Sequence, residues 1–176
     1  MAYHSEFDNE FCQQKRIRVI CGIPILPLKT STKGPAPVQT NNDNDIVDEV
    51  LYYFKANVFF RQYDLESAAD RLIVYLTLYV TQCLKDMGRI TNREGAESSM
   101  ALLAKSQFPL SGDGGFPLSA FFEKPDNTSD AELIRSYFIQ LRHETGIRLA
   151  QRVYRKGRAD KWWICFTKKK FLNLEL

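Results

Sequence analysis

The run LIVYLTLYV, residues 72–80, is apolar at all but one position and sets a tight limit on the fold. A helix with one solvent-facing side shows polar residues every three or four positions, whereas this run is apolar almost all round. We therefore predict a buried central helix from about residue 65 to residue 87, ended by Gly88, with other helices around it. The apolar stretch is shorter than the roughly 20 residues of a membrane span, so no membrane partner is expected.

A second helix is predicted to begin after Asp45, a good N-cap, with Asp48 and Glu49 in its first turn. We expect Asn57 to end this helix in the left-handed conformation. One face carries apolar residues at helical spacing, which are Val47, Val50, Leu51, Phe54 and Val58.

The stretch YYFKANVFF, residues 52–60, holds more rings than one helical face can use. Tyr53 and Phe60 fall off the apolar stripe. Most aromatic residues of a chain this size belong to the core, and these two are the ones we expect to face a second surface or a partner.

Weaker helical patterns complete the body. Residues 91–105 form one, and an S-x-x-E capping box at Ser129 and Glu132 starts another that reaches Gly146 or continues to Tyr154. A final segment begins at KWWICF. The predicted fold class is therefore all-α, with about five helices and one buried central helix.

Residues 1–44 differ from this helical body. They hold a strand-like run, RIRVICGIPILPL, followed by a turn-rich stretch, and their four prolines are incompatible with a helix across the region. We predict an extended Pro-rich arm, packed on the body or on a partner, within a single domain spanning residues 1–176. Residues 45–176 form the helical body.

The sequence shows few of the residue patterns that catalytic, phosphate-binding or metal-binding sites need. His4 is placed in a loose N-terminus and His143 at the exposed end of a charged helix, neither with a catalytic partner in view. The glycines of residues 111–116 lack the phosphate-loop pattern. No cofactor and no metal site is expected, and an enzyme with a polar pocket around His143 or Asp113 is the weakest alternative.

The cysteines and the N-terminus indicate the compartment. The four cysteines lack metal-ligand spacing, and we expect reduced thiols in a cytoplasmic protein. The acidic start MAYHSEFDNEF resembles neither a signal nor a transit peptide.

The C-terminal segment is the most suggestive candidate site. Trp162 and Trp163 are the only tryptophans, and Lys168, Lys169 and Lys170 follow. Such a pattern can bind single-stranded nucleic acid, can be a packed Trp with solvated lysines, or can dock a protein through aromatic anchors with a basic rim. A net charge of +3 is too small to favour nucleic acid by itself.

Seven short motifs follow one another along the chain in an order and at distances that are typical of one protein family. They are AYHSEF, KGPAP, DIVDE, YYFKANVFF, GFPL, LRHETGIRL and KWWICF. In this the chain closely resembles the subunit 3 family of the actin-related protein 2/3 complex, over residues 2 to about 173. Glu175 departs from it, because a basic terminus is typical there.

The resemblance implies a non-catalytic scaffold in a seven-subunit assembly of the actin cytoskeleton. It implies docking on the actin-related protein 3 subunit, a possible contact with the actin filament, and no nucleic-acid partner. It also implies that ATP and magnesium belong to the actin-related subunits. The residues that we expect at partner interfaces are Tyr53, Phe60, Trp162, Lys168, Lys169, Lys170 and Phe171.

Overall fold

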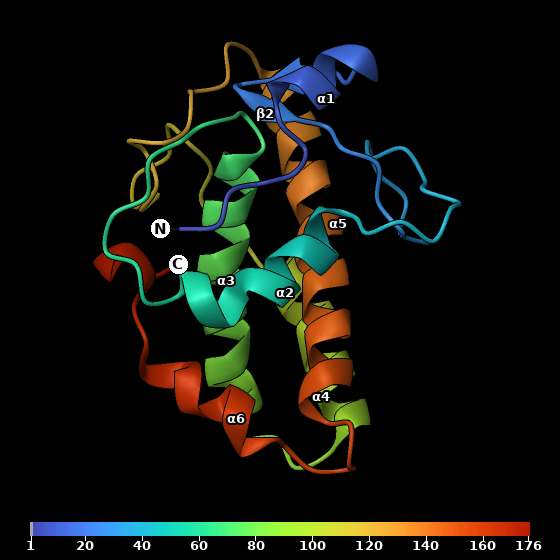
Figure 1. Cartoon of the computed structure of the whole chain (residues 1–176), viewed down its shortest axis with the longest axis vertical. Helices are drawn as coiled ribbons and strands as arrows, with labels where there is room; N and C mark the ends of the chain where they lie inside the picture. Colours follow the sequence, from blue (N-terminus) through green and yellow to red (C-terminus); the bar gives the residue numbers. More distant parts are fainter. Residues whose placement is uncertain (1) are drawn as a thin grey trace.

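The protein is mostly helical, and the computed structural model describes residues 2–176 (Figure 1). Its elements in chain order are α1 (Asn9–Gln14), β1 (Val19–Ile20), β2 (Ile23–Pro24), α2 (Ile46–Asn57), α3 (Asp70–Met87), α4 (Arg93–Lys105), α5 (Thr128–Val153) and α6 (Lys161–Ile164), followed by the 3₁₀ turns η1 (Cys165–Lys168) and η2 (Phe171–Asn173).

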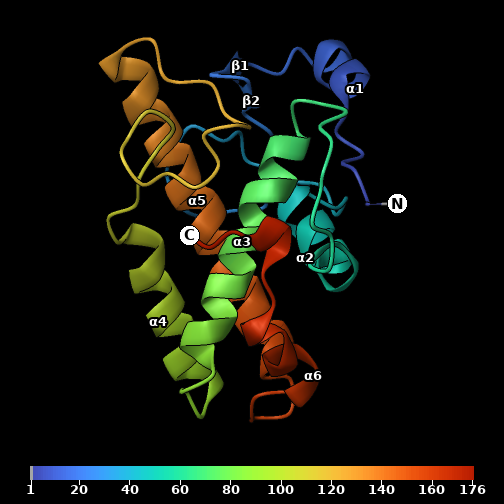
Figure 2. The same ribbon diagram turned by 90° about the vertical axis from the view of Figure 1, so that its left-hand side faces the viewer.

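Helix α3 is the predicted central helix. It is buried along nearly its whole length, and α2, α4, α5 and the C-terminal segment surround it (Figure 2). It begins at Asp70, later than predicted, because the Asp70 carboxylate accepts the backbone N–H groups of Glu66 (2.8 Å) and Ser67 (3.2 Å). These bonds hold the preceding residues in a turn instead of a helix.

Helix α2 confirms the predicted start and the predicted apolar face. Asp45 and Asp48 form a capping box, and all five residues of the stripe are buried. The helix ends at Asn57 as predicted, but the predicted left-handed conformation of this residue is wrong, since Asn57 keeps a negative φ. Its buried amide side chain instead exchanges two hydrogen bonds with the backbone of Tyr3, at 2.9 and 3.0 Å.

Helix α5 runs unbroken through Gly146 for 26 residues. A Cβ atom at Gly146 would lie 2.7 Å from Cβ of Met100, so glycine permits α4 to pack this closely on α5. The expected capping box at Ser129 and Glu132 is wrong, because Asn127 caps the helix by accepting the backbone N–H of Asp130 at 2.8 Å.

The first 44 residues are not simply extended, and the fold is not purely all-α. Asp8 caps the short helix α1, and β1 and β2 form a hairpin in which Ile20 pairs with Ile23. Cys21 (φ 52°) and Gly22 (φ 71°) make its two-residue turn, where both residues need positive φ. The hairpin lies at one end of the molecule, beside α1 and near the start of α5 (Figure 1).

Candidate functional site

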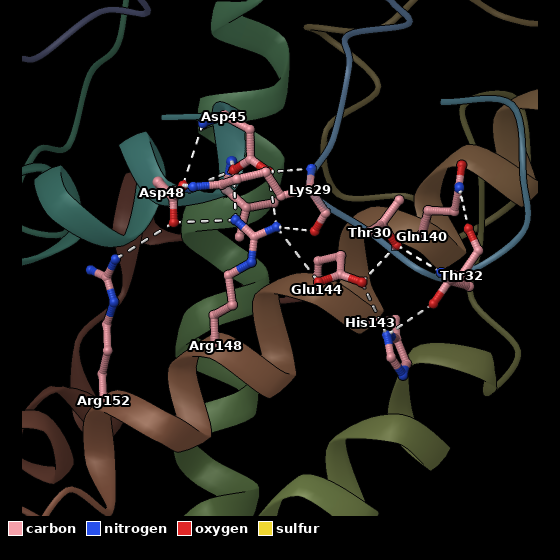
Figure 3. Close-up of polar contacts among 11 residues, drawn as sticks. Lys29, Thr30, Thr32, Asp45, Asp48, Gln140, His143, Glu144, Arg148 and Arg152 are labelled. Carbon is pink, nitrogen blue, oxygen red and sulfur yellow. Dashed lines mark hydrogen bonds and ion pairs between the residues drawn. The ribbon is translucent and has the colours of Figure 1, made fainter. Parts of the chain in front are cut away.

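A network of polar side chains joins the N-terminal region to α2 and α5 (Figure 3). At its centre Arg148 donates to both carboxylate oxygens of Asp45, at 2.7 and 2.8 Å, and to the carbonyl of Lys29 at 2.6 Å. Asp45 also caps α2 and accepts the backbone N–H of Lys29 at 2.9 Å. One carboxylate thus ties together three segments that lie far apart in the sequence.

The same side of α5 continues this contact with residues 30–36. The hydroxyl of Thr30 donates to Glu144 at 2.6 Å, and Gln140 bonds the carbonyl of Thr32 and the N–H of Ala36, at 2.7 and 2.9 Å. We call this set the arm seam, and it comprises Lys29, Thr30, Thr32, Ala36, Asp45, Asp48, Gln140, His143, Glu144 and Arg148.

The charged side chains of the arm seam are paired with one another. Burial alone would raise the pKa of Asp48, but a hydrogen bond from Lys29 and the charge of Arg148 lower it below its ordinary value. Burial likewise would lower the pKa of Arg148, and Asp45, Asp48 and Glu144 raise it instead. Every charge here already has a partner inside the chain, so the seam serves folding.

Both histidines lie elsewhere than the sequence suggested. His143 is half-buried in the middle of α5, and its Nδ1 lies 3.2 Å from the hydroxyl of Thr32. His4 is not loose, because its ring lies 3.0 Å from a carboxylate oxygen of Asp70 and 3.3 Å from one of Glu66. Both side chains hold N-terminal residues in place.

Within residues 2–176 no cluster of His, Cys, Asp or Glu is arranged to hold a metal ion, and all four cysteines are free. None of the helices described is both long and apolar enough to cross a membrane.

A second region is a surface of aromatic rings and lysines, all exposed except the half-buried Phe166. Tyr52, Lys55 and Phe59 recur at helical spacing on the outer side of α2 and its end. Trp162, Phe166 and Lys169 do so along α6, η1 and the residue that follows η1. We call these six residues the aromatic–basic face.

Contacts between the two stripes join them into one surface. Phe166 packs edge-on against Phe59, with ring centroids 5.9 Å apart, and Nζ of Lys169 lies 5.1 Å from the Phe59 ring. Tyr52 and Trp162 remain 76% and 66% exposed. Exposed aromatic side chains that gather in one patch make this face a candidate binding surface.

The positive charge of the chain is concentrated around this face. Residues 151–176 carry eight Lys and Arg against two acids, so the rest of the chain has a net negative charge. Lys161 lies over the Trp162 ring and Lys55 over that of Trp163, at 5.3 and 4.4 Å from the centroids. Apart from Lys170, which meets Glu175 at 3.0 Å, few of these cations have an acidic partner.

The expected interface residues fall into three groups. Trp162 and the lysines 168–170 are exposed, as an interface residue must be. Tyr53 and Phe60 are half-buried, with the Tyr53 ring stacked on Tyr3 at 4.5 Å. Phe171 is fully buried against Tyr63, so its ring contributes to the core.

Sequence reasoning missed Tyr52 and Phe59, the most exposed rings of residues 52–60. The signal was present, since both lie opposite the buried stripe of α2 at a spacing of seven residues. Trp163 is buried and stacks on Phe54 at 6.0 Å, which leaves Trp162 as the outward member of the pair.

Comparisons with known proteins agree with the resemblance in the motifs. The model of the family "P21-Arc: ARP2/3 complex ARPC3 (21 kDa) subunit" matches residues 1–176. A relative from Dictyostelium discoideum, "Actin-related protein 2/3 complex subunit 3", is 46% identical over the full length of both chains. Proteins of the same name from Arabidopsis thaliana and Schizosaccharomyces pombe are 41% and 38% identical, and the alignments cover 98–99% of each chain.

These matches cover both regions described above, the arm seam and the aromatic–basic face. The chain therefore belongs to the ARP2/3 complex ARPC3 subunit family.

Proposed function

We propose that this chain is a non-catalytic structural subunit of an actin-related protein 2/3 complex and supports nucleation of branched actin filaments by docking on the actin-related protein 3 subunit. Its place is then the cytoplasm, at the actin cytoskeleton. The observation that carries the proposal is the aromatic–basic face, where the rings of Tyr52, Phe59 and Trp162 stay exposed. Its two lysines, Lys55 and Lys169, pair with no carboxylate within residues 2–176. Family membership supports the identity of the assembly.

The composition of the face suits a protein partner. Interface centres are enriched in aromatic residues and depleted in acids, and a few exposed rings supply most of the binding energy. Tyr52, Phe59 and Trp162 are such anchors. The lysines at their rim favour a partner surface with acidic residues, and the expected contacts Tyr53, Phe60, Lys168 and Lys170 adjoin the face in the sequence.

The proposal is tested by co-expressing the tagged chain with the other subunits and measuring how much actin-related protein 3 is recovered with it. The variant Trp162→Ala/Lys169→Glu is expected to lower recovery at least tenfold. A matched control is Leu102→Ala/Lys105→Glu, which changes an exposed leucine and an exposed lysine on α4.

Recovery unchanged in the face variant, or reduced equally in both variants, would overturn docking through this face. Absence of both actin-related proteins from the wild-type preparation would overturn the assembly itself. Branch formation on preformed filaments, followed by microscopy, gives a second readout and should fall with recovery.

A further inference from the structure

A groove of about 690 Å³ lies between α1, the segments on either side of the hairpin and the turns of residues 35–44. Helix α1 and the hairpin lie at the end of the molecule opposite α6 (Figure 1). The apolar lining of the groove is only partly covered by the chain. The half-buried side chains are those of Phe7, Phe11, Ile17, Pro27, Pro35 and Leu133.

This lining has the character of a binding site. The Phe7 and Phe11 rings meet edge to face at 5.1 Å and form one wall, and buried Ile25 contributes to the floor. Concave apolar surface that the chain itself leaves open is where ligands and partner side chains are commonly bound.

The rim of the groove is positively charged. Lys15, Arg16 and Arg18 line it, all exposed, and within residues 2–176 none of them lies within 4 Å of a carboxylate. By contrast, Arg148 in the arm seam is paired with Asp45 at 2.7 Å. The one acid that lines the groove is Asp43, which accepts a hydrogen bond from Asn41 at 2.6 Å.

The end of α1 fixes the backbone that carries Lys15 and Arg16. The N–H of Ile17 donates to the carbonyl of Cys12 at 2.9 Å and that of Arg16 to Gln13 at 3.1 Å, the two bonds of a Schellman motif. Arg16 takes the left-handed position (φ 51°) that glycine usually occupies there.

We propose that this groove binds a short segment of a partner subunit in which apolar side chains are flanked by acidic ones. The apolar side chains lie against Phe7, Phe11 and Leu133, and the acidic ones pair with Lys15, Arg16 and Arg18. The contact is separate from that on the aromatic–basic face, so the chain joins two partner surfaces at its two ends. This inference rests on the proposed function, because the partner is another subunit of the same assembly.

The test places a photo-crosslinking benzoylphenylalanine at position 11 of this chain within the co-expressed assembly, and the crosslinked peptide is sequenced by mass spectrometry. We expect one peptide of another subunit that contains both apolar and acidic residues. The same group at position 102, on the exposed side of α4, is expected to give no such product.

Charge reversal then tests the recognition itself. Lys15→Glu/Arg18→Glu should lower the crosslink yield at least tenfold, whereas Arg89→Glu/Lys105→Glu, at two exposed positions outside both proposed surfaces, should leave it unchanged. A crosslink to a second copy, to this chain alone or to a peptide without acids would overturn the inference, as would a yield that does not respond to charge. If the assembly is recovered with an empty groove, only this inference fails; if no assembly is recovered, the proposed function fails as well.

Discussion

The arm seam and the aromatic–basic face both gather cations, and they differ in where those cations find their partners. In the seam Arg148 meets two carboxylate oxygens, a carbonyl and the end of a helix. On the face Lys55 and Lys169 lie over aromatic rings, and the neighbouring Lys161 lies over Trp162. Charges that the chain neutralises itself stabilise its fold, and charges that it leaves over are available for a partner.

The largest expected effect comes from breaking the seam. Arg148→Met leaves the buried Asp45 without its cation, and removing one partner of a buried pair costs about 3–5 kcal/mol. Urea unfolding of the purified chain measures this. Arg152→Met is the control, because Arg152 only approaches Asp48 at 3.9 Å and its loss should cost about 0–1 kcal/mol. Equal losses in the two variants would contradict the prediction.

The two tryptophans extend the comparison to neighbouring residues. Trp163→Ala removes a ring that is 8% exposed and stacked on Phe54, and the free energy of unfolding is expected to fall by about 3–5 kcal/mol. The thermal unfolding midpoint should fall with it. A loss below about 1 kcal/mol would show that the C-terminal segment contributes little to the core.

Glu49 shows what burial does to the pKa of an acid that has no ion pair, because its buried carboxyl is held by hydrogen bonds alone. Burial raises the pKa of its carboxyl, against bonds from the Glu6 N–H and the Ser5 hydroxyl. The Glu49 carboxyl therefore loses its proton at a lower pH in the unfolded chain than in the folded chain. The free energy of unfolding falls as pH rises from about 4 through the folded pKa. Glu49→Gln should flatten that decline, measured by urea midpoints between pH 3 and 8.

Two controls accompany this variant. Glu132→Gln, at an exposed position, should keep the wild-type slope. The loss of stability below about pH 4 that comes from Asp48, whose pKa is lowered, should remain in every case. A Glu49→Gln profile that follows the wild type throughout would refute the prediction.

The smallest expected effect on stability belongs to the face. Trp162→Ala removes a ring that is 66% exposed, and the free energy of unfolding should change by no more than about 0.5 kcal/mol. Its effect should appear in the assembly, where losing an aromatic anchor costs about 2 kcal/mol or more. Competition of wild-type and variant chains for the same partners measures this, and a large loss of stability in the free chain would contradict it.

Much of the fold follows from local pattern. The buried helix was predictable because residues 72–80 are apolar on every side, and the start of α2 because Asp45 and Asp48 supply a complete cap. Helix α1 was not predicted, and the strand-like run of residues 16–28 was predicted without its fold into the hairpin of β1 and β2, since six-residue helices and two-residue strands are stabilised mainly by packing on the rest of the chain.

The candidate site was predictable only in part. Trp162 and the lysines that follow were identified by their spacing, whereas Phe171 proved to be buried. Which ring of an aromatic cluster faces outward depends on the surfaces that cover it, and the segment covering α2 lies more than 100 residues away.

The sequence by itself determined the central helix and the capped start of α2, because these depend on residues close together in the chain. Only the tertiary structure decided that Asp45, recognised as a cap, is also the partner of Arg148, and that Trp163 turns inward while Trp162 stays outside. Pairing and burial between distant segments depend on how helices pack, which local periodicity does not encode.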